Sequence, residues 1–344
     1  MQKNLRAFFK RTRPSARTSS LLGVAALALA GSAVLVNRRA AQAERDYLPK
    51  GRFVTVDGVR LHYVEKGSGP PVVFLHGNGA MVEDMLISGV VEHTASAYRS
   101  IVFDRPGFGH SERPGDRYWT AAAQALLFAR TFAQLGIGSS IVVGQSWGTL
   151  VALALALNHP QSVGGLVLAS GYYFPTARSD VALFSLPSMP IAGDLISYTV
   201  APIIGEAIGW PLIAKMFAPQ PVSPKFEREF PMPLALRPSQ IKAFSQDTSH
   251  MITAAQQLSP RYGTITCPTV IMAGDADRIV NVERQSQRLH GAIPGSRLAV
   301  LNGAGHMIHH LDPARMVRAI DLIATGGITR ASMQEEAATW GTRA

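Results

Sequence analysis

The sequence contains very little cysteine: Cys267 is the only one among 344 residues. A lone cysteine excludes an intrachain disulfide in any compartment. Because Cys267 precedes Pro268 at the start of an apolar run, we interpret it as a small structural residue and not as a reactive thiol. The sequence also lacks a Cys/His cluster with zinc-ligand spacing and a glycine-rich loop followed by a Lys-Ser or Lys-Thr pair. It therefore predicts no metal ion and no cofactor.

Excess positive charge is nearly absent from most of the chain, although the net charge is +10. Residues 1–46 hold nine Lys/Arg and two Asp/Glu, a net of +7, which leaves only +3 for the remainder. No basic stripe interleaved with aromatic residues follows, so we expect no nucleic-acid partner. Basic residues beside an apolar segment favour anionic lipid headgroups instead.

Charged residues are missing altogether from 18–37, and Leu21–Val36 is almost entirely apolar. Twenty residues of helix rise about 30 Å, enough to cross the hydrocarbon core of a bilayer. The stretch 1–17 forms a basic tail, and Arg38 and Arg39 follow the apolar run. Since the more basic flank stays cytoplasmic, we expect the rest of the chain on the other side of the membrane.

A cleaved signal peptide is the alternative interpretation of this segment. The sequence Ala41-Gln42-Ala43 resembles a cleavage site. Two arginines separate the apolar run from that site, and this favours a retained, single-pass signal anchor. The segment 38–50 is then expected to be a linker.

Beyond the linker, strand-like and helix-like segments alternate. Apolar alternation on both sides of Asp57-Gly58 predicts a β-hairpin. The predicted strands are Arg52–Val56, Val59–Glu65, Val72–Leu75, Ile101–Asp104, Ser140–Val143, Leu166–Ala169, Pro268–Ala273 and Arg297–Leu301. The predicted helices are Val82–Tyr98, Ala121–Leu135, Leu150–Leu157 and Pro313–Ile323. This order predicts an α/β fold, with a mostly parallel sheet and helices on both faces, built from 51–171 and 263–325.

Residues 172–262 interrupt the alternation and are rich in proline and apolar residues. Prolines throughout the segment predict short helices, which we interpret as a helical cap over the site. Its apolar content favours a small-molecule substrate with an acyl, aryl or lactone group. The stretch 326–344 has no clear apolar face and is expected to be a loose C-terminal tail.

The chemistry-bearing pattern is Gly144-Gln145-Ser146-Trp147-Gly148, which follows a β-branched run and precedes a helical one. Such a Gly-x-Ser-x-Gly predicts a sharp strand-to-helix turn that lifts the serine hydroxyl above the sheet. An aspartate pair, Asp275 and Asp277, follows a later strand, and His306 follows the last one. Open α/β sheets place their chemistry at these carboxyl ends of strands.

Five segments together resemble the α/β-hydrolase superfamily of the serine-nucleophile type. They are His76-Gly77-Asn78-Gly79, Asp104–Ser111, Gly144–Gly148, Gly274–Val280 and Gly303–His306. The resemblance implies that Ser146 is the nucleophile, His306 the general base and Asp277 the acid that orients it, with Asp275 as the alternative acid.

The same resemblance implies an oxyanion hole made by the backbone amides of Asn78 and Trp147. It assigns supporting positions to His76, Gly77, Gly144 and Gly148, and a structural role to Arg105. The remaining histidines near the motifs, His110, His309 and His310, are expected in loops or at the surface.

A tryptophan after the nucleophile together with Asn78 is similar to haloalkane dehalogenases, where such a pair holds the departing halide. Those enzymes attack with aspartate, because water can cleave the resulting ester, whereas a serine ether would persist. The sequence therefore predicts a carboxylesterase that forms an acyl-enzyme. A lactonase, a C–C bond hydrolase or a cofactor-free perhydrolase would use the same triad, and a non-catalytic ligand-binding protein would share the fold. The sequence does not indicate the oligomeric state.

Overall fold

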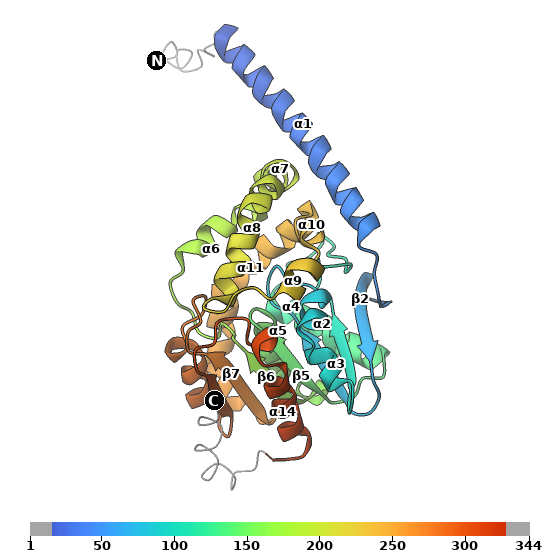
Figure 1. Ribbon diagram of the computed structural model, residues 1–344, viewed down its shortest axis with the longest axis vertical. Coiled ribbons are helices and arrows are strands. Elements are labelled where there is room, and N and C mark those ends of the chain that lie inside the picture. Colours follow the sequence, from blue (N-terminus) through green and yellow to red (C-terminus); the bar gives the residue numbers. More distant parts are fainter. Residues whose placement is uncertain (1–15, 328–344) are drawn as a thin grey trace, which may run out of the picture.

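An eight-stranded sheet forms the centre of the protein in the computed structural model, which describes residues 16–327 (Figure 1). The strands lie in the order β1-β2-β4-β3-β5-β6-β7-β8. Their bounds are β1 Arg52–Val56, β2 Val59–Lys66, β3 Pro71–Leu75, β4 Arg99–Phe103, β5 Ser140–Gln145, β6 Val163–Ala169, β7 Thr269–Gly274 and β8 Arg297–Leu301. Most of the expected basic tail and loose C-terminal tail, 1–15 and 328–344, lies outside the described residues.

The first two strands form the predicted hairpin, in which Asp57 and Gly58 both have positive φ angles of 51° and 76°. Such angles suit the two-residue turn whose twist matches that of the strands. β2 is antiparallel to β4, and every further pairing from β3 to β8 is parallel. The carboxyl ends of β3 to β8 therefore lie along one edge of the sheet, which confirms the predicted fold class.

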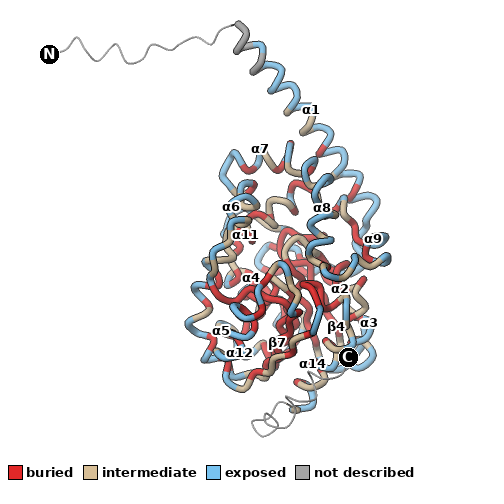
Figure 2. The backbone as a smooth tube through the Cα atoms, turned by 60° about the vertical axis from the view of Figure 1, so that its left-hand side comes forward, coloured by how far each residue is buried: buried red, intermediate tan, exposed pale blue. Residues whose placement is uncertain are grey.

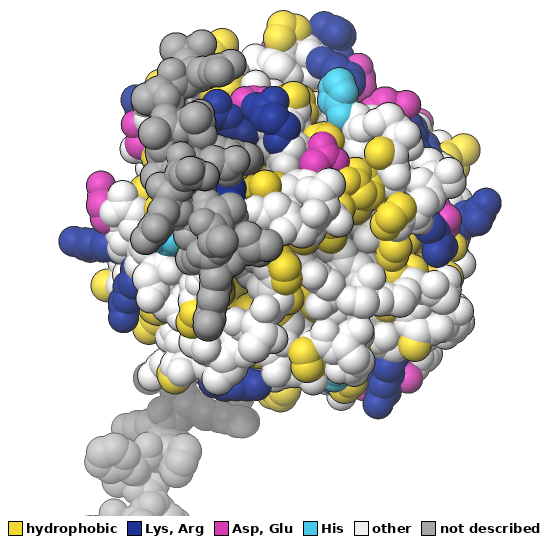
Figure 3. Space-filling view, turned by 90° about the horizontal axis from the view of Figure 1, so that it is seen from below, with side chains coloured by type: hydrophobic (Ala, Val, Ile, Leu, Met, Phe, Trp, Pro, Cys, Tyr) yellow, Lys and Arg dark blue, Asp and Glu magenta, His cyan; other side chains and the backbone are white. Residues whose placement is uncertain are grey.

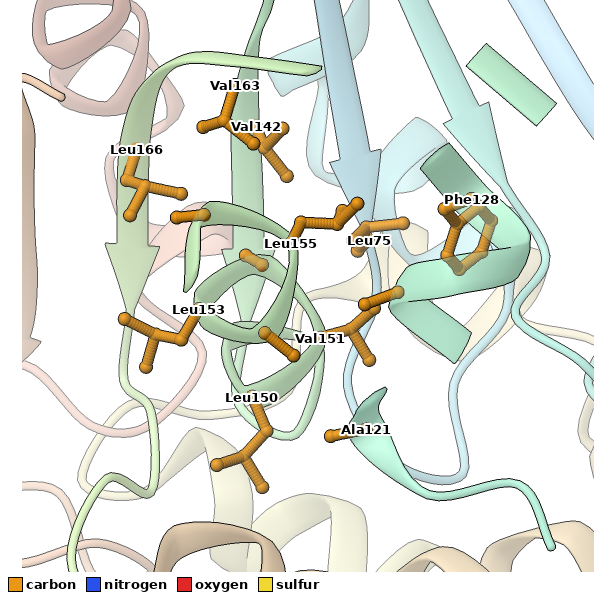
Figure 4. Close-up of a cluster of buried hydrophobic side chains, with 14 of the residues drawn as sticks. Leu75, Ala121, Phe128, Val142, Leu150, Val151, Leu153, Leu155, Val163 and Leu166 are labelled. Carbon is orange, nitrogen blue, oxygen red and sulfur yellow. The ribbon is translucent and has the colours of Figure 1, made fainter. Parts of the chain in front are cut away.

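Helices cover both faces of the sheet because strand side chains alternate between them. In β3, Val73 and Leu75 join the core that contains α4 and α5, while Val72 and Phe74 join the core on the other face. Figure 4 shows Leu155 of α5 beside Leu75 and Val142 of the strands, and Val151 of α5 on the side where Phe128 of α4 lies. The core helices are α2 Val82–Ser88, α3 Val90–Thr94, α4 Ala121–Gln134, α5 Gly148–Asn158, α12 Arg288–Ala292, α13 Ile308–Leu311 and α14 Pro313–Ala324.

The helix predicted over Val82–Tyr98 is interrupted. Gly89, with φ of 83°, ends α2 and begins α3. A left-handed residue at this position stops a helix, and glycine adopts it without a Cβ penalty. The sequence pattern of apolar residues continues across the break, which is why it predicted a single helix.

The cap consists of helices that lie above the carboxyl edge of the sheet (Figure 1). They are α6 Ser179–Phe184, α7 Ala192–Thr199, α8 Ala201–Phe217, α9 Pro224–Glu229, α10 Met232–Ala235 and α11 Pro238–Leu258. The prediction that prolines cut this segment into short helices is wrong for α8 and α11, which span 17 and 21 residues. Pro202 and Pro238 lie in the first turns, where a missing N–H costs nothing, and Pro211 is accommodated inside α8.

The N-terminal helix α1, Ala16–Asp46, continues through residues 38–46, which were expected to belong to a linker. Its last turns contact the cap, because Val36 and Ala43 are buried and Arg39 pairs with Glu206 of α8. Its earlier turns project beyond the body of the protein and are exposed (Figure 2). α1 is long and apolar enough to cross a membrane, and only 6% of its apolar window is buried.

Candidate active site

Ser146 lies at the turn between β5 and α5 with a φ angle of 49°. Positive φ is uncommon for a residue with a side chain and marks a backbone held by its surroundings. A Cβ at Gly144 would lie 2.8 Å from the Cα of Thr149, and one at Gly148 would lie 2.2 Å from the carbonyl oxygen of Leu75. Both glycines are required by this close approach, so the local structure is the sharp turn that the motif predicts.

Asp277 and His306 follow β7 and β8 and meet at the same edge. The Nδ1 atom of His306 lies 2.8 Å from Oδ2 of Asp277, and both side chains are 1% exposed. The other carboxylate oxygen, Oδ1, accepts hydrogen bonds from the backbone N–H groups of Ile279 and Val280 at 2.7 and 3.0 Å. These bonds fix the carboxylate that orients the imidazole.

The alternative acid, Asp275, points elsewhere. Its side chain accepts a hydrogen bond from the backbone N–H of Gly303 at 2.6 Å, and the residue is exposed. The structure thus brings Asp277, and not Asp275, to the imidazole of His306.

The free end of that imidazole is available for chemistry. With Nδ1–H donating to Asp277, Nε2 of His306 carries the lone pair. This atom is buried and has no hydrogen-bond partner within residues 16–327. The loop around it is packed under the end of α8, because the N–H of His306 donates to the carbonyl oxygen of Met216 at 3.1 Å.

The loop after β3 lies against the serine turn. A Cβ at Gly77 would come within 3.1 Å of the Cβ of Ser146 and 2.3 Å of Oε1 of Gln145. The backbone N–H groups of Asn78 and Trp147 donate to no acceptor in the described part of the chain. Two unused amide donors beside a serine hydroxyl are the components of an oxyanion hole.

A buried guanidinium holds this loop in place. Arg105 donates to the carbonyl oxygens of His76 and Gly77 at 2.9 and 3.0 Å, and it pairs with Asp247 at 2.5 Å. Its backbone N–H donates to Nε2 of His76 at 3.0 Å. Burial and the nearby charge of Arg105 lower the pKa of His76 to about 4, so the ring accepts this bond as a neutral imidazole.

Asp247, on α11, is a site residue that the sequence did not reveal. Its fully buried carboxylate also receives bonds from Arg113 at 2.9 Å and from Gln124 at 3.2 Å. Asp247 is 142 residues from Arg105 in the sequence, and it belongs to no recognisable sequence motif. The contact connects the cap to the loop after β3, which contains Asn78.

Two further side chains of the site are bonded to α11. Nδ2 of Asn78 donates to the carbonyl oxygen of Phe244 at 3.0 Å and to Oγ1 of Thr248 at 2.9 Å. The indole N–H of Trp147 donates to the carbonyl oxygen of Asp247 at 2.9 Å. The side-chain donors that would hold a halide are therefore already engaged.

His309 is buried and His310 is partly buried, both on α13, which corrects the expectation that they lie in loops or at the surface. Their Nε2 atoms lie 3.2 and 2.8 Å from the two carboxylate oxygens of Asp84 on α2. Burial alone would raise the pKa of Asp84, but the two histidines hold it well below its usual value. Within residues 16–327 these three side chains form the group whose spacing could hold a metal ion, and their mutual hydrogen bonds already satisfy the carboxylate.

A groove of about 990 Å³ lies between the loop that follows β4 and the start of α11. Glu44, His110, Arg113 and Tyr198 are among its lining residues, whereas Ser146 and His306 are not. His110 belongs to a loop, as expected from the sequence, and is half-buried there.

Comparison with known proteins identifies the family once this geometry is considered. The profile of the alpha/beta hydrolase family matches residues 72–319. The chain belongs to the alpha/beta hydrolase family. An uncharacterized protein of Mycobacterium tuberculosis is 29% identical over 287 residues, covering 79% of this chain and 80% of that protein.

Two other similarities are informative about this hydrolase. Haloalkane dehalogenase 2 of Mycobacterium tuberculosis is 26% identical over 266 residues, covering 76% of this chain and 90% of that one. The crystal structure of a bacterial membrane phospholipase A aligns with a TM-score of 0.62 at 22% identity, covering 90% of this chain and 96% of that chain. The second similarity extends over nearly the whole length but shows the fold alone.

Proposed function

We propose that this hydrolase is a membrane-anchored carboxylesterase that cleaves apolar esters through an acyl-enzyme. The observation that carries the proposal is the placement of a strained Ser146 at the edge where Asp277 fixes His306. A partly buried serine at a sharp turn, an imidazole whose Nε2 atom has no hydrogen-bond partner in the described residues and two unused amide donors are the components that acyl transfer needs.

The reaction proceeds in two steps. Nε2 of His306 takes the hydroxyl proton as Ser146 Oγ attacks the ester carbonyl, and the carbonyl oxygen becomes negative. The amides of Asn78 and Trp147 stabilise that oxygen. His306 then gives its proton to the leaving alcohol, and in the second step it activates a water molecule that releases the acid.

Dehalogenation is not supported, although a dehalogenase is among the relatives. A serine nucleophile would form an ether that water does not cleave. The side chains of Asn78 and Trp147 are also occupied by α11 and are not free to hold a halide.

A retained membrane anchor is supported by the way α1 packs. Ala43 is 2% exposed and belongs to an apolar cluster that includes Phe226, Phe230 and Met307. Cleavage after Ala43 would remove this contact and the ion pair between Arg39 and Glu206. We place the basic N-terminal flank in the cytoplasm and the hydrolase domain on the other side of the membrane.

The test is hydrolysis of a graded p-nitrophenyl ester series by the full chain in detergent, with Ser146→Ala as the matched variant. We expect turnover of medium or long acyl esters by the native chain, and a loss on the order of 10,000-fold or more in Ser146→Ala. Lactones, ring-cleavage diketones and a haloalkane are assayed in parallel. Faster turnover of a lactone or diketone than of every ester would replace the esterase assignment, and halide release would contradict the serine mechanism.

A further inference from the structure

Exposed apolar side chains of the cap gather where α1 leaves the body of the protein. Eleven of the 21 large apolar side chains that are exposed in the described residues lie between 183 and 212, and Ile191 is 87% exposed. At the end of the molecule away from α1, the described residues show apolar side chains scattered among charged ones (Figure 3). A concentration of this kind indicates an apolar partner and not a water-facing surface.

We call the exposed apolar side chains of α7, of the first turn of α8 and of the residue between them the cap patch; they are Leu195, Tyr198, Val200, Ile203 and Ile204. Both charged side chains between 181 and 206 are paired. Asp194 pairs with Lys242 of α11, and Glu206 pairs with Arg39 of α1. An apolar partner would therefore meet no unpaired charge in this segment.

The length of α1 determines how the cap patch lies relative to a bilayer. The hydroxyl of Ser32 donates to the carbonyl oxygen of Thr199, the last residue of α7, at 2.7 Å. Only 18–31 of the uncharged segment precedes that contact, and these 14 residues rise about 21 Å as a helix. A bilayer has a hydrocarbon core of about 30 Å. The part of α1 beyond the cap is too short to cross it alone.

Residues 32–37 must therefore also lie in the hydrocarbon core if α1 crosses it. Together with 18–31 they form an uncharged helical segment of about 30 Å. If these residues lie in the hydrocarbon core, Thr199 lies there with them, because its carbonyl is bonded to Ser32. Arg38 follows six residues later, so Thr199 is about 9 Å deeper than the arginine along the helix axis.

We propose that the cap patch is embedded in the lipid bilayer beside α1, on the side of the membrane that holds the hydrolase domain. The inference rests on the membrane span proposed above. A depth of about 9 Å matches the roughly 5–10 Å at which interfacial helices lie. The ion pair between Arg39 and Glu206 then lies at the headgroups, where charge is tolerated.

Lipid is the occupant because the cap patch continues the surface of α1 itself. Val34 and Leu35 of α1 are exposed within one helical turn of Ser32, whose hydroxyl is bonded to Thr199. If the span is in lipid, these side chains touch acyl chains, and the neighbouring side chains of α7 reach the same layer.

The single native cysteine allows a direct test with nitroxide labels. In a Cys267→Ser background of the full chain, cysteine is introduced at Leu195, Ile204, Leu27 or Leu126, all of them exposed positions. Leu27 reports the span, and Leu126, on α4, is the matched control outside the membrane. Each variant is reconstituted into vesicles of phosphatidylethanolamine and phosphatidylglycerol. Collision rates with oxygen and with a water-soluble nickel chelate are then compared.

We expect labels at 195 and 204 to resemble the label at 27, with high oxygen and several-fold lower nickel collision rates than the label at 126. Labels at 195 and 204 that match the label at 126, while 27 is shielded, would overturn the inference and leave the span intact. Shielding of 195 and 204 from both reagents would also overturn it, because it would report a protein partner such as a second copy. A nickel-accessible label at 27 would overturn the span itself.

Discussion

At the scale of single residues, the candidate site depends on which aspartate holds His306. Two aspartates in one short loop follow β7, and the sequence distinguishes them only through the family resemblance. The structure separates them by their partners: Asp277 receives two backbone N–H bonds and faces the imidazole, whereas Asp275 bonds to Gly303. Their roles in catalysis are therefore expected to differ sharply.

We predict that Asp277→Asn lowers kcat for a p-nitrophenyl ester by on the order of 1,000- to 10,000-fold, because an amide does not hold the required tautomer. Asp275→Asn is the matched control and should keep kcat within a few-fold of the native value. Steady-state kinetics on both purified variants measure the difference. An equal loss in the two variants would contradict the assignment of the acid.

Glu83 is a buried carboxylate on α2 whose Oε2 atom has no hydrogen-bond partner in residues 16–327. Burial, followed by the negative charge of Asp104, raises the pKa of Glu83 to about 7. Below its ordinary pKa both the folded and unfolded states are protonated, and no penalty arises. As the pH rises toward 7, the unfolded state ionises first, so the folded state loses up to about 3 kcal/mol of stability.

We therefore predict that Glu83→Gln raises the melting temperature at pH 8.5 and changes it little at pH 4.5. Glu92→Gln is the control of opposite sign, because Lys66 lowers the pKa of this exposed carboxyl. Calorimetric scans across this pH range test both variants. A stabilisation by Glu83→Gln that does not grow with pH would rule out the ionisation argument.

At the scale of elements, α11 is the part of the cap that determines the shape of the site. Its buried Asp247 neutralises Arg105, and Arg105 in turn holds the carbonyl oxygens of the loop that contains Asn78. Removing the charge of one partner from a buried pair leaves the other charge uncompensated.

Asp247→Asn should lower the free energy of unfolding by about 3–5 kcal/mol. Asp57→Asn, which breaks a surface pair with Arg130, should change it by no more than about 1 kcal/mol. Denaturant unfolding followed by fluorescence compares the two variants. Similar small effects would show that the Arg105 contact is not what fixes the loop.

Local patterns in the sequence predicted the strands, the serine turn and the chain order of the site residues, because each depends on a few consecutive residues. Contacts between distant residues were not predictable. The bond between Arg105 and Asp247 joins positions 142 apart, and His309 and His310 contact Asp84, which lies more than 200 residues earlier. The lengths of α8 and α11 were not predicted. A proline interrupts a helix in its interior but is tolerated in the first turn, and the sequence does not show which of these positions a proline occupies.

At the scale of the whole molecule, α1 belongs to the folded body as well as to the proposed span. Glu44 pairs with Arg237 in the cap at 2.8 Å, and Val36 is 3% exposed. These contacts orient the domain relative to the helix, and the topology proposed from the positive-inside rule would put the domain outside the cytoplasm.

This orientation predicts the labelling of a cysteine at position 118, where the native tyrosine is 82% exposed on the core. In a Cys267→Ser background, a membrane-impermeant maleimide should label Tyr118→Cys in cells whose outer envelope layer has been permeabilised and whose inner membrane is intact. The unmodified background is the control. Labelling that requires disruption of the inner membrane would place the domain in the cytoplasm.

The central claim is that Ser146 is an activated nucleophile, and covalent trapping tests it most directly. The full chain is treated with a fluorophosphonate and digested, and the modified peptide is identified by mass spectrometry. We predict one adduct, on Ser146, that is lost in Ser146→Ala and strongly slowed in His306→Ala, because the imidazole takes the hydroxyl proton. An unmodified Ser146 in folded protein, or equal labelling in the His306→Ala variant, would contradict the account.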